Sequence, residues 1–144
     1  MRATIPLSEG DHLADFPELR MEQPAGLVAT VREGLPIDRF DVLKSLLGVS
    51  SEELTEVVGI SASTLSRRRE QGSFKKDESE RILRVARLAL RAVEVFEGTA
   101  NARKWLTDPA RALGGESPLR FADTEPGAQE VERMLLRLEH GVYS

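Results

Sequence analysis

Apolar and polar positions follow one another along this chain with the period of an α-helix. After about residue 26, apolar residues recur three and four positions apart in most segments. No stretch of useful length shows the two-residue alternation of a β-strand. Leu, Val, Ala, Glu and Arg abound while aromatic residues are few, which also favours helices. The pattern therefore predicts an all-α protein.

The most informative stretch, residues 50–72, contains two short helical patterns joined by a tight turn. Ser50 and Glu53 have the spacing of a capping box at the start of the first helix. Gly59 suits its end, because glycine adopts the left-handed conformation without a steric penalty. Ser61 is placed to cap the second helix. Two short helices with a tight turn between them are typical of a helix-turn-helix.

The second of these helices carries candidate DNA-binding side chains. Steps of about 100° per residue place Ser63, Ser66 and Arg67 on one face, and Ala62 and Leu65 towards a core. Small hydroxyl residues let a helix enter the major groove closely, and arginines reach guanine edges or phosphates. A plain helical hairpin with a solvated charged face has the same pattern, so both interpretations stay open. The candidate residues are Ser63, Thr64, Ser66, Arg67, Arg68, Arg69, Lys75 and Lys76.

A longer helix is predicted after the hairpin, from about Asp77 to Glu97. Asp77 and Glu80 have the spacing of a second capping box. Arginines stand between its apolar positions, where they either cover the core with their stems or meet phosphate. Because this helix continues well past the hairpin, we expect it to join the hairpin to the rest of the chain without a free linker.

The pattern divides the chain into three parts. Residues 1–25 combine three prolines and five acids with no sustained period, so we expect weak order there. Residues 26–97 are predicted to form the helix-turn-helix domain, and residues 98–144 a smaller C-terminal domain of short helices. His140 falls in the last turn of the final helix, where a positive imidazole suits the helix dipole.

The distribution of charge points to more than one partner. The formal net charge is −4, but residues 61–91 hold nine basic and four acidic residues, so this middle segment is positive. The rest of the chain is correspondingly acidic. A basic middle between acidic flanks predicts an anionic partner for the middle and a different partner for the ends.

Several classes of protein are disfavoured by what the sequence lacks. It has no cysteine, and its two histidines are far apart, so no metal site or catalytic pair is indicated. It also has no glycine loop that would bind phosphate, and we therefore expect neither an enzyme nor a cofactor. No apolar run approaches the roughly 20 residues that span a bilayer. The N-terminus lacks the apolar core of a signal peptide, so we expect a cytoplasmic protein without a membrane partner.

Four sequence blocks follow one another between residues 59 and 144: GISASTLSRRRE at 59–70, KKDESERILRVARL at 75–88, AVEVFEGTANARKWLTDPARALGGESPL at 92–119 and DTEPGAQEVERMLLRLEHGVYS at 123–144. The most specific part is the pairing of a WL..P..ALGG..PL string with a terminal HGV. In this order the blocks resemble the Xre/MbcA/ParS antitoxins, which are the DNA-binding partners of RES-domain toxins in bacteria. The resemblance covers about four-fifths of the chain, from about residue 31 onwards.

The resemblance implies two activities. An antitoxin of this family blocks the active site of a toxin that consumes NAD, and it binds operator DNA to repress its own operon. In the family the C-terminal domain faces the toxin. On this chain the implied toxin-binding residues are Arg133, Arg137, Glu139, His140, Gly141, Val142, Tyr143 and Ser144.

The chemistry of the final residues also suits the inhibition of an enzyme. An aromatic ring offers stacking area at low entropic cost, and a carboxylate can replace a substrate phosphate at arginines. A terminus that contacts nothing is the alternative. At the level of the whole protein, the alternative is a free-standing helix-turn-helix regulator without a toxin partner. Either protein is expected to form a homodimer, because one helix-turn-helix covers only a half-site.

One position departs from the family. After the Thr64-Leu65-Ser66-Arg67 string, many repressor-type relatives have an apolar residue that packs into the core, whereas this chain has Arg68. We expect the stem of Arg68 to pack there while its head reaches a phosphate.

Overall fold

The computed structural model describes residues 16–20 and 24–141, and every regular element in these ranges is a helix. The all-α prediction is therefore confirmed. The only strand-like pairing in the described residues is an isolated bridge between Pro36 and Ser73. The elements are η3 Pro17–Arg20, α2 Pro24–Glu33, α3 Asp38–Leu47, α4 Ser51–Val58, α5 Ala62–Gln71, α6 Lys76–Phe96, α7 Thr99–Thr107, η4 Arg111–Leu113, α8 Pro118–Phe121 and α9 Glu125–His140.

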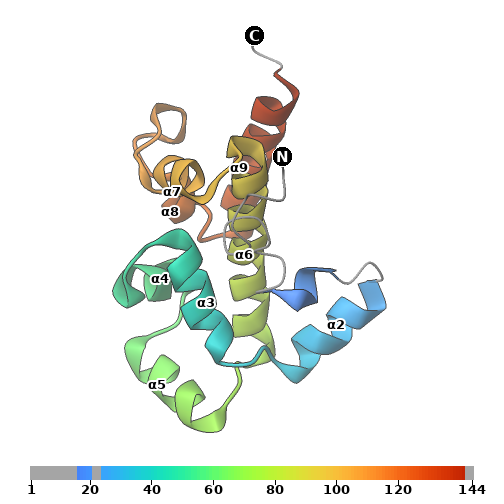
Figure 1. The fold of residues 1–144 in the computed structure, drawn as a ribbon. Helices are drawn as coiled ribbons and strands as arrows, with labels where there is room; N and C mark the ends of the chain where they lie inside the picture. Colours follow the sequence, from blue (N-terminus) through green and yellow to red (C-terminus); the bar gives the residue numbers. More distant parts are fainter. Residues whose placement is uncertain (1–15, 21–23, 142–144) are drawn as a thin grey trace.

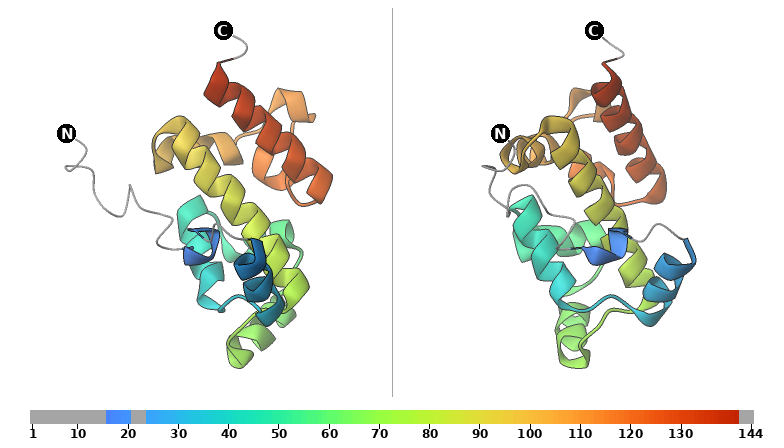
Figure 2. Two further views of the ribbon diagram at one scale, coloured as in Figure 1. Left: turned by 90° about the vertical axis from the view of Figure 1, so that its right-hand side faces the viewer. Right: turned by 45° about the vertical axis from the view of Figure 1, so that its right-hand side comes forward.

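Helix α6 is the central element on which both halves of the protein pack (Figure 1). Helices α2, α3 and α4 contact it in one half, and α7 and α9 contact it in the other (Figure 2). Burial of its apolar face drives this arrangement, since side chains from Ile82 to Ala92 lie in one continuous core. Helix α5 and the C-terminal end of α9 consequently lie at opposite ends of the molecule.

Local capping chemistry fixes the hairpin that the sequence predicts. The Ser50 hydroxyl accepts a hydrogen bond from the backbone N–H of Glu53 at 3.1 Å, and Gly59 ends α4 in the left-handed conformation. Ser61 caps α5 in the same way, accepting from the N–H of Thr64 at 3.1 Å. Ile60 is buried in the turn between them. Helices α4 and α5 form the predicted helix-turn-helix.

The start of α6 differs from the prediction. The helix begins at Lys76, and the carboxylate of Glu78 accepts a hydrogen bond from the backbone N–H of Lys75 at 2.8 Å. Asp77 and Glu80, which have the same spacing two residues further on, are exposed and do not cap it. Glu78 takes this position because it also pairs with a buried side chain of α5.

A smaller prediction about a helix face is also wrong. The helical pattern turns Ala62 towards the core, but this residue is exposed at the first turn of α5. Helix α7 begins at Thr99, and Gly98 precedes it without a side-chain cap. Glu97, just before, ends α6 with a positive φ of 56°.

The helix-turn-helix half includes residues that precede its expected start at residue 26. Phe16 is fully buried in the core, and η3 follows it directly. The carboxylate of Glu18 receives hydrogen bonds from Arg39 of α3 at 2.8–3.1 Å. Of the residues 1–25 for which the sequence predicts weak order, 1–15 and 21–23 lie outside the described residues. The described part of this segment packs on the domain.

Arginines connect the two halves of the protein besides α6 itself. Arg103 of α7 donates to the carbonyls of Ser45 and Leu46 at the end of α3, at 2.7 and 2.9 Å. Arg120 of α8 pairs with Glu56 of α4 at 2.5 Å. The expectation of no free linker is confirmed. None of the helices described is long and apolar enough to cross a membrane.

Candidate nucleic-acid interface and C-terminal helix

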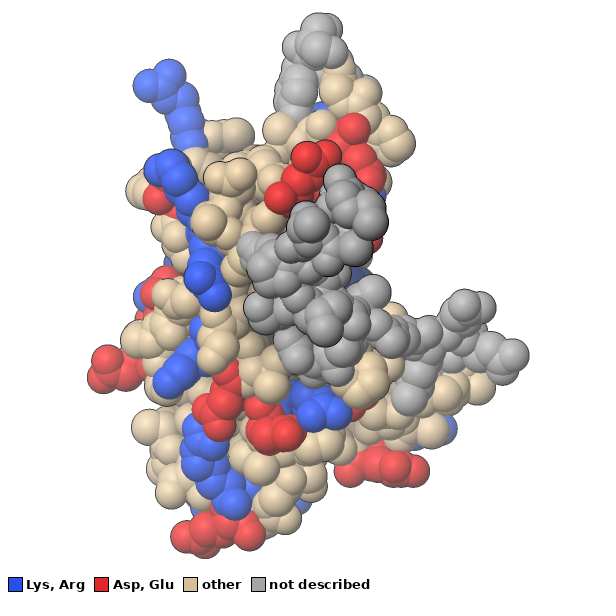
Figure 3. Space-filling model, viewed as in Figure 1, with Lys and Arg blue, Asp and Glu red and all other residues tan. Residues whose placement is uncertain are grey.

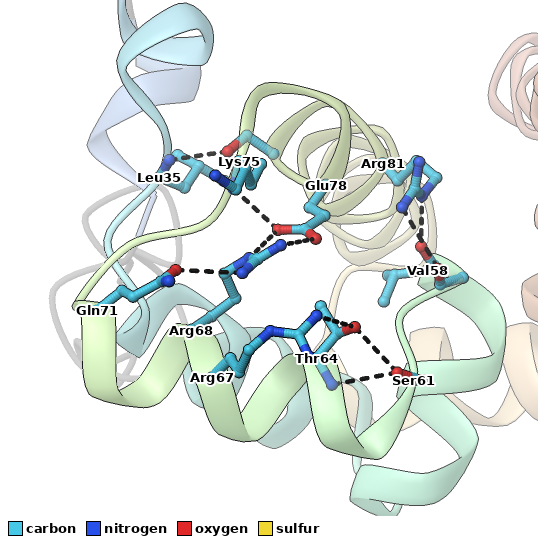
Figure 4. A network of polar contacts seen from close by, with 12 residues as sticks. Leu35, Val58, Ser61, Thr64, Arg67, Arg68, Gln71, Lys75, Glu78 and Arg81 are labelled. Atoms are coloured by element: carbon cyan, nitrogen blue, oxygen red, sulfur yellow. Dashed lines mark hydrogen bonds and ion pairs between the residues drawn. The ribbon is translucent and has the colours of Figure 1, made fainter.

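The three consecutive arginines of α5 have three different environments. Arg67 is exposed and forms no ion pair with the residues described. Its guanidinium donates a hydrogen bond to the Thr64 hydroxyl at 3.2 Å, and this hydroxyl accepts from Ser61 at 3.0 Å (Figure 4). The N-cap of the helix therefore also orients Arg67, which reduces the conformational entropy that the side chain would lose on binding.

Arg68, the next residue, points towards α6 (Figure 4). It is buried, and its guanidinium forms a bidentate pair with Glu78 of α6 at 2.8 and 2.9 Å. A third hydrogen bond, at 3.1 Å, goes to the side chain of Gln71 (Figure 4). This pairing corrects the expectation that the head of Arg68 reaches a phosphate. The hydrogen bonds from Arg68 also lower the pKa of Glu78 below its ordinary value.

Arg69 is exposed but already has a carboxylate partner. Both of its terminal nitrogens donate to Asp41 of α3 at 3.0 Å, and its guanidinium lies 5.9 Å from the centre of the Phe40 ring. The same hydrogen bonds lower the pKa of Asp41. Arg69 thus holds α5 against α3, and DNA would have to compete with Asp41 for it.

The other predicted DNA-binding residues lie on α5 and at the start of α6. Ser63 and Ser66 are exposed on α5, Thr64 is half-buried, and Lys75 and Lys76 are exposed where α6 begins. Lysine and arginine side chains do not gather into one large patch on the face shown in Figure 3, since acidic residues lie among them. The structure brings together Ser63, Ser66 and Arg67, and it separates Arg68 from them.

The C-terminal end of α5 is fixed by contacts between two loops. The N–H of Ile37 donates to the carbonyl of Gly72 at 3.0 Å, and the N–H of Phe74 donates to the carbonyl of Leu35 at 2.9 Å. The N–H of Leu35 in turn donates to the buried Ser79 hydroxyl at 2.8 Å (Figure 4). We call these contacts the loop bridge. Sequence reasoning missed it, because no local pattern relates residues so far apart in the chain.

Most arginines of α6 are used inside the protein. Arg81 donates to the carbonyl of Val58 at 2.6 Å, which caps the end of α4. Arg84 reaches Glu125 and the carbonyl of Asp123 at 3.3–3.4 Å, and Arg91 pairs with Glu94 and Glu139. The count of basic residues in 61–91 therefore overstates the positive charge that remains for an external anion. Arg87, unlike the other arginines of α6, is exposed.

The outer end of α9 carries the other predicted interface. Arg133 and Arg137 both form ion pairs with Glu130, at 3.0 and 3.6 Å, and both arginine side chains are about half exposed. Glu139 is paired with Arg91 of α6 at 3.1 Å, whereas His140 is well exposed. Gly141 ends the helix in the left-handed conformation. The remaining predicted residues Val142, Tyr143 and Ser144 lie outside the described residues.

Comparison with known proteins matches each half of the chain to a described domain family. A family described as the antitoxin Xre-like helix-turn-helix domain matches residues 26–87, and one described as the antitoxin Xre/MbcA/ParS C-terminal toxin-binding domain matches residues 91–141. A protein of Yersinia enterocolitica named Antitoxin Xre is 35% identical over 148 residues, covering 100% of both chains. This chain belongs to the Xre antitoxin family.

Two further relatives extend the comparison. An Antitoxin Xre of Photorhabdus laumondii is 36% identical over 120 residues, covering 82% of this chain and 81% of that protein. A more distant relative from a Sphingobium species is named Prs ADP-ribosylating antitoxin and is 20% identical over 139 residues, covering 90% and 87%. As an Xre antitoxin, the chain combines a helix-turn-helix with a toxin-binding domain. Within the described residues, no group of acidic or histidine side chains has the arrangement of a metal site.

Proposed function

We propose that this chain neutralises a RES-domain toxin that consumes NAD and represses its own operon by binding operator DNA. The observation that carries the proposal is the separation of two functional ends on one helix. Helix α5, on which Thr64 orients the exposed Arg67, lies at one end of α6, and the outer end of α9 lies at the other. One chain can therefore bind DNA and a protein at the same time without steric conflict.

The DNA half of the proposal rests on the exposed side of α5. Ser63 and Ser66 are small enough to let the helix lie deep in a major groove, and Arg67 can then donate two hydrogen bonds to one guanine. Lys75 and Lys76, just after the helix, would contact phosphates and position it. Arg68 has no part in this surface, since Glu78 already occupies its guanidinium.

The toxin half rests on α9 and the last residues of the chain. Arg133, Arg137 and His140 are exposed on the outer end of this helix, and Gly141 ends it in the left-handed conformation. The adjoining Val142, Tyr143 and Ser144 would enter the active site, with the Tyr143 ring as the largest contact. One relative is named Prs ADP-ribosylating antitoxin, and because ADP-ribosyl groups are transferred from NAD, this name favours a toxin-antitoxin system in which NAD is consumed.

The toxin half is tested with a RES-domain protein, which we expect to be encoded beside this chain's gene. We expect the full chain to form a stable complex with it and to stop its consumption of NAD. Deletion of residues 140–144 should weaken inhibition while leaving the fold of the chain intact. Arg67→Ala is the matched control, since it removes a charged side chain at the opposite end and should inhibit like the unaltered chain.

The DNA half is tested by binding to the promoter region of the same operon. The full chain and the 140–144 deletion should bind equally, while Arg67→Ala binds more weakly. A chain that binds the promoter but has no effect on the RES-domain protein would be a free-standing regulator. A chain that inhibits the toxin but ignores the promoter would disprove the DNA half alone.

A further inference from the structure

Helix α9 has one face towards the core and another towards solvent. Ala128, Val131 and Leu135 are buried on the first face. The exposed residues of the helix recur three or four positions apart, which places them together along its other side. We call this side the outer face of α9, and its exposed residues are Gln129, Arg133, Leu136, Arg137 and His140.

Leu136 is the apolar residue in the middle of the outer face. It is 38% exposed, and among the described residues only one other large apolar side chain, Val28 in the helix-turn-helix half, is comparably exposed. An exposed leucine gains free energy when another surface covers it. The domain around Leu136 indicates what that surface is, because residues 91–141 match a family described as toxin-binding.

Two arginines flank Leu136 on the outer face. Arg133 and Arg137 share one carboxylate, that of Glu130, and the nitrogen–oxygen distance from Arg137 is 3.6 Å. Glu130 therefore satisfies only part of the hydrogen-bonding capacity of two guanidiniums, each of which has five donors. Protein interfaces favour arginine among the charged residues, since its stem packs while its head donates to the partner.

The outer face adjoins the residues that are proposed to enter the toxin's active site. Leu136 lies five residues before Gly141, which is about 8 Å along a helix axis. Val142, Tyr143 and Ser144 are only three residues, whereas a stable interface buries about 800 Å² on each partner. A larger surface has to supply most of the affinity, and the outer face is the exposed part of α9 beside them.

We infer that Leu136 is the apolar anchor of toxin binding. It fills an apolar pocket of the toxin, while Arg133 and Arg137 donate to carboxylate or carbonyl oxygens at the rim of that pocket. Docking through the outer face and blocking of the active site by residues 142–144 are then two separable contacts. The inference rests on the toxin half of the proposed function, which gives Leu136 no role.

The test measures affinity and inhibition separately, with the full chain and a RES-domain toxin. Isothermal titration calorimetry gives the dissociation constant, and NAD consumption at saturating antitoxin gives the extent of inhibition. Leu136→Asp should raise the dissociation constant roughly 30-fold or more, because a carboxylate then enters an apolar pocket. At saturation it should still stop NAD consumption, since residues 142–144 are intact. Deletion of residues 142–144 should have the reverse effect, with tighter binding than Leu136→Asp but incomplete inhibition at saturation.

Two further variants serve as controls. Leu136→Met keeps the apolar bulk and should bind the toxin within about threefold of the unaltered chain. Val28→Asp places the same charge on the other exposed apolar residue and should leave both measurements unchanged. Circular dichroism establishes that every variant is folded.

A folded Leu136→Asp variant that binds the toxin as tightly as the unaltered chain would overturn the inference. So would one that is saturated with toxin but no longer inhibits it. Sedimentation velocity without toxin gives a third such result: if Leu136→Asp dissociates an antitoxin dimer, a second copy covers this residue instead. If the unaltered chain forms no complex with the toxin, the toxin half of the proposed function fails together with the inference, whereas the other results leave that half standing.

Discussion

The two ends of α6 hold their functional helices by different means. At the α5 end, the exposed Arg69–Asp41 pair is joined by contacts that are buried or formed by backbone atoms: the Arg68–Glu78 pair and the loop bridge between residues 34–37 and 72–79. At the α9 end, the contact that ties the last turn to α6 is the Arg91–Glu139 ion pair, and both partners are partly exposed.

This difference matches what each end has to recognise. Reading base edges requires a helix held in one orientation, and buried bonds, which water does not weaken, provide this. Exposed ion pairs are worth little, so the outer end of α9 can exchange its internal partner for an external one at small cost. Substitutions at the two ends test this comparison, beginning with the largest expected effect.

Gly34→Ala should destabilise the α5 end most. Gly34 has a φ of +97°, and a Cβ there would lie 2.1 Å from the carbonyl oxygen of Phe74, inside the loop bridge. We expect a loss of about 3 kcal/mol or more in the free energy of unfolding, because backbone must move in addition to the strain of positive φ. Urea unfolding followed by circular dichroism measures it.

Gly72→Ala is the control for that experiment. Gly72 has nearly the same φ, +92°, but a Cβ there would meet no atom within 4 Å. It should cost only about 1 kcal/mol, which is the conformational part alone. Equal losses for the two variants would show that the loop bridge contributes nothing beyond backbone conformation.

Arg67→Ala should weaken promoter binding by about 1–3 kcal/mol and relax the preference for one base pair, if Arg67 reads a guanine. Arg69→Ala, two residues away, should have a smaller effect, since Asp41 already holds this guanidinium. Electrophoretic mobility shifts at fixed salt measure both. A larger loss for Arg69→Ala would mean that the paired arginine is the one that contacts DNA.

The contribution of Glu78 to the stability of the α5 end should depend on pH. Arg68 lowers its pKa below the ordinary value near 4.5, so the unfolded chain binds this proton more readily than the folded chain. The stabilisation is complete above about pH 4.5 and is lost as the pH falls through the pKa of the folded state. The difference in melting temperature between the unaltered chain and Glu78→Gln should therefore shrink below about pH 4.5. A difference that stays constant down to about pH 3 would exclude this origin.

Arg91→Ala should have the smallest effect, below about 1 kcal/mol in unfolding free energy, since its partners Glu94 and Glu139 are exposed to screening by water and salt. Raising the salt concentration should reduce the difference further. A loss as large as that of Gly34→Ala would contradict the distinction between the two ends.

Local chemistry is readable from the sequence wherever a few neighbouring residues decide the outcome. The caps at Ser50 and Ser61 and the end of α4 at Gly59 follow from such short patterns and are confirmed. Arg68 shows where this reasoning stops. Its own position predicts a packed stem, but the partner that keeps its charge inside the protein, Glu78, lies on another helix.

The same limit explains the error at the start of α6. Two acids, Glu78 and Glu80, stand near the correct distance from a helix start, and local spacing does not choose between them. The buried guanidinium of Arg68 decides in favour of Glu78, because the Glu78 carboxylate can accept hydrogen bonds both from Arg68 of α5 and from the backbone N–H of Lys75 before α6. The three arginines likewise differ in role only because Thr64, Glu78 and Asp41 lie on different sides of α5.

Helix α6 belongs to both halves, and this limits how the protein can be divided. The two matched regions meet between residues 87 and 91, in the middle of this helix and of its buried face. A fragment or a hybrid protein joined at that boundary would expose core side chains at the cut in either piece. Exchange of recognition specificity between relatives is therefore expected to succeed by replacing the surface of α5 alone, with α6 kept whole from one parent.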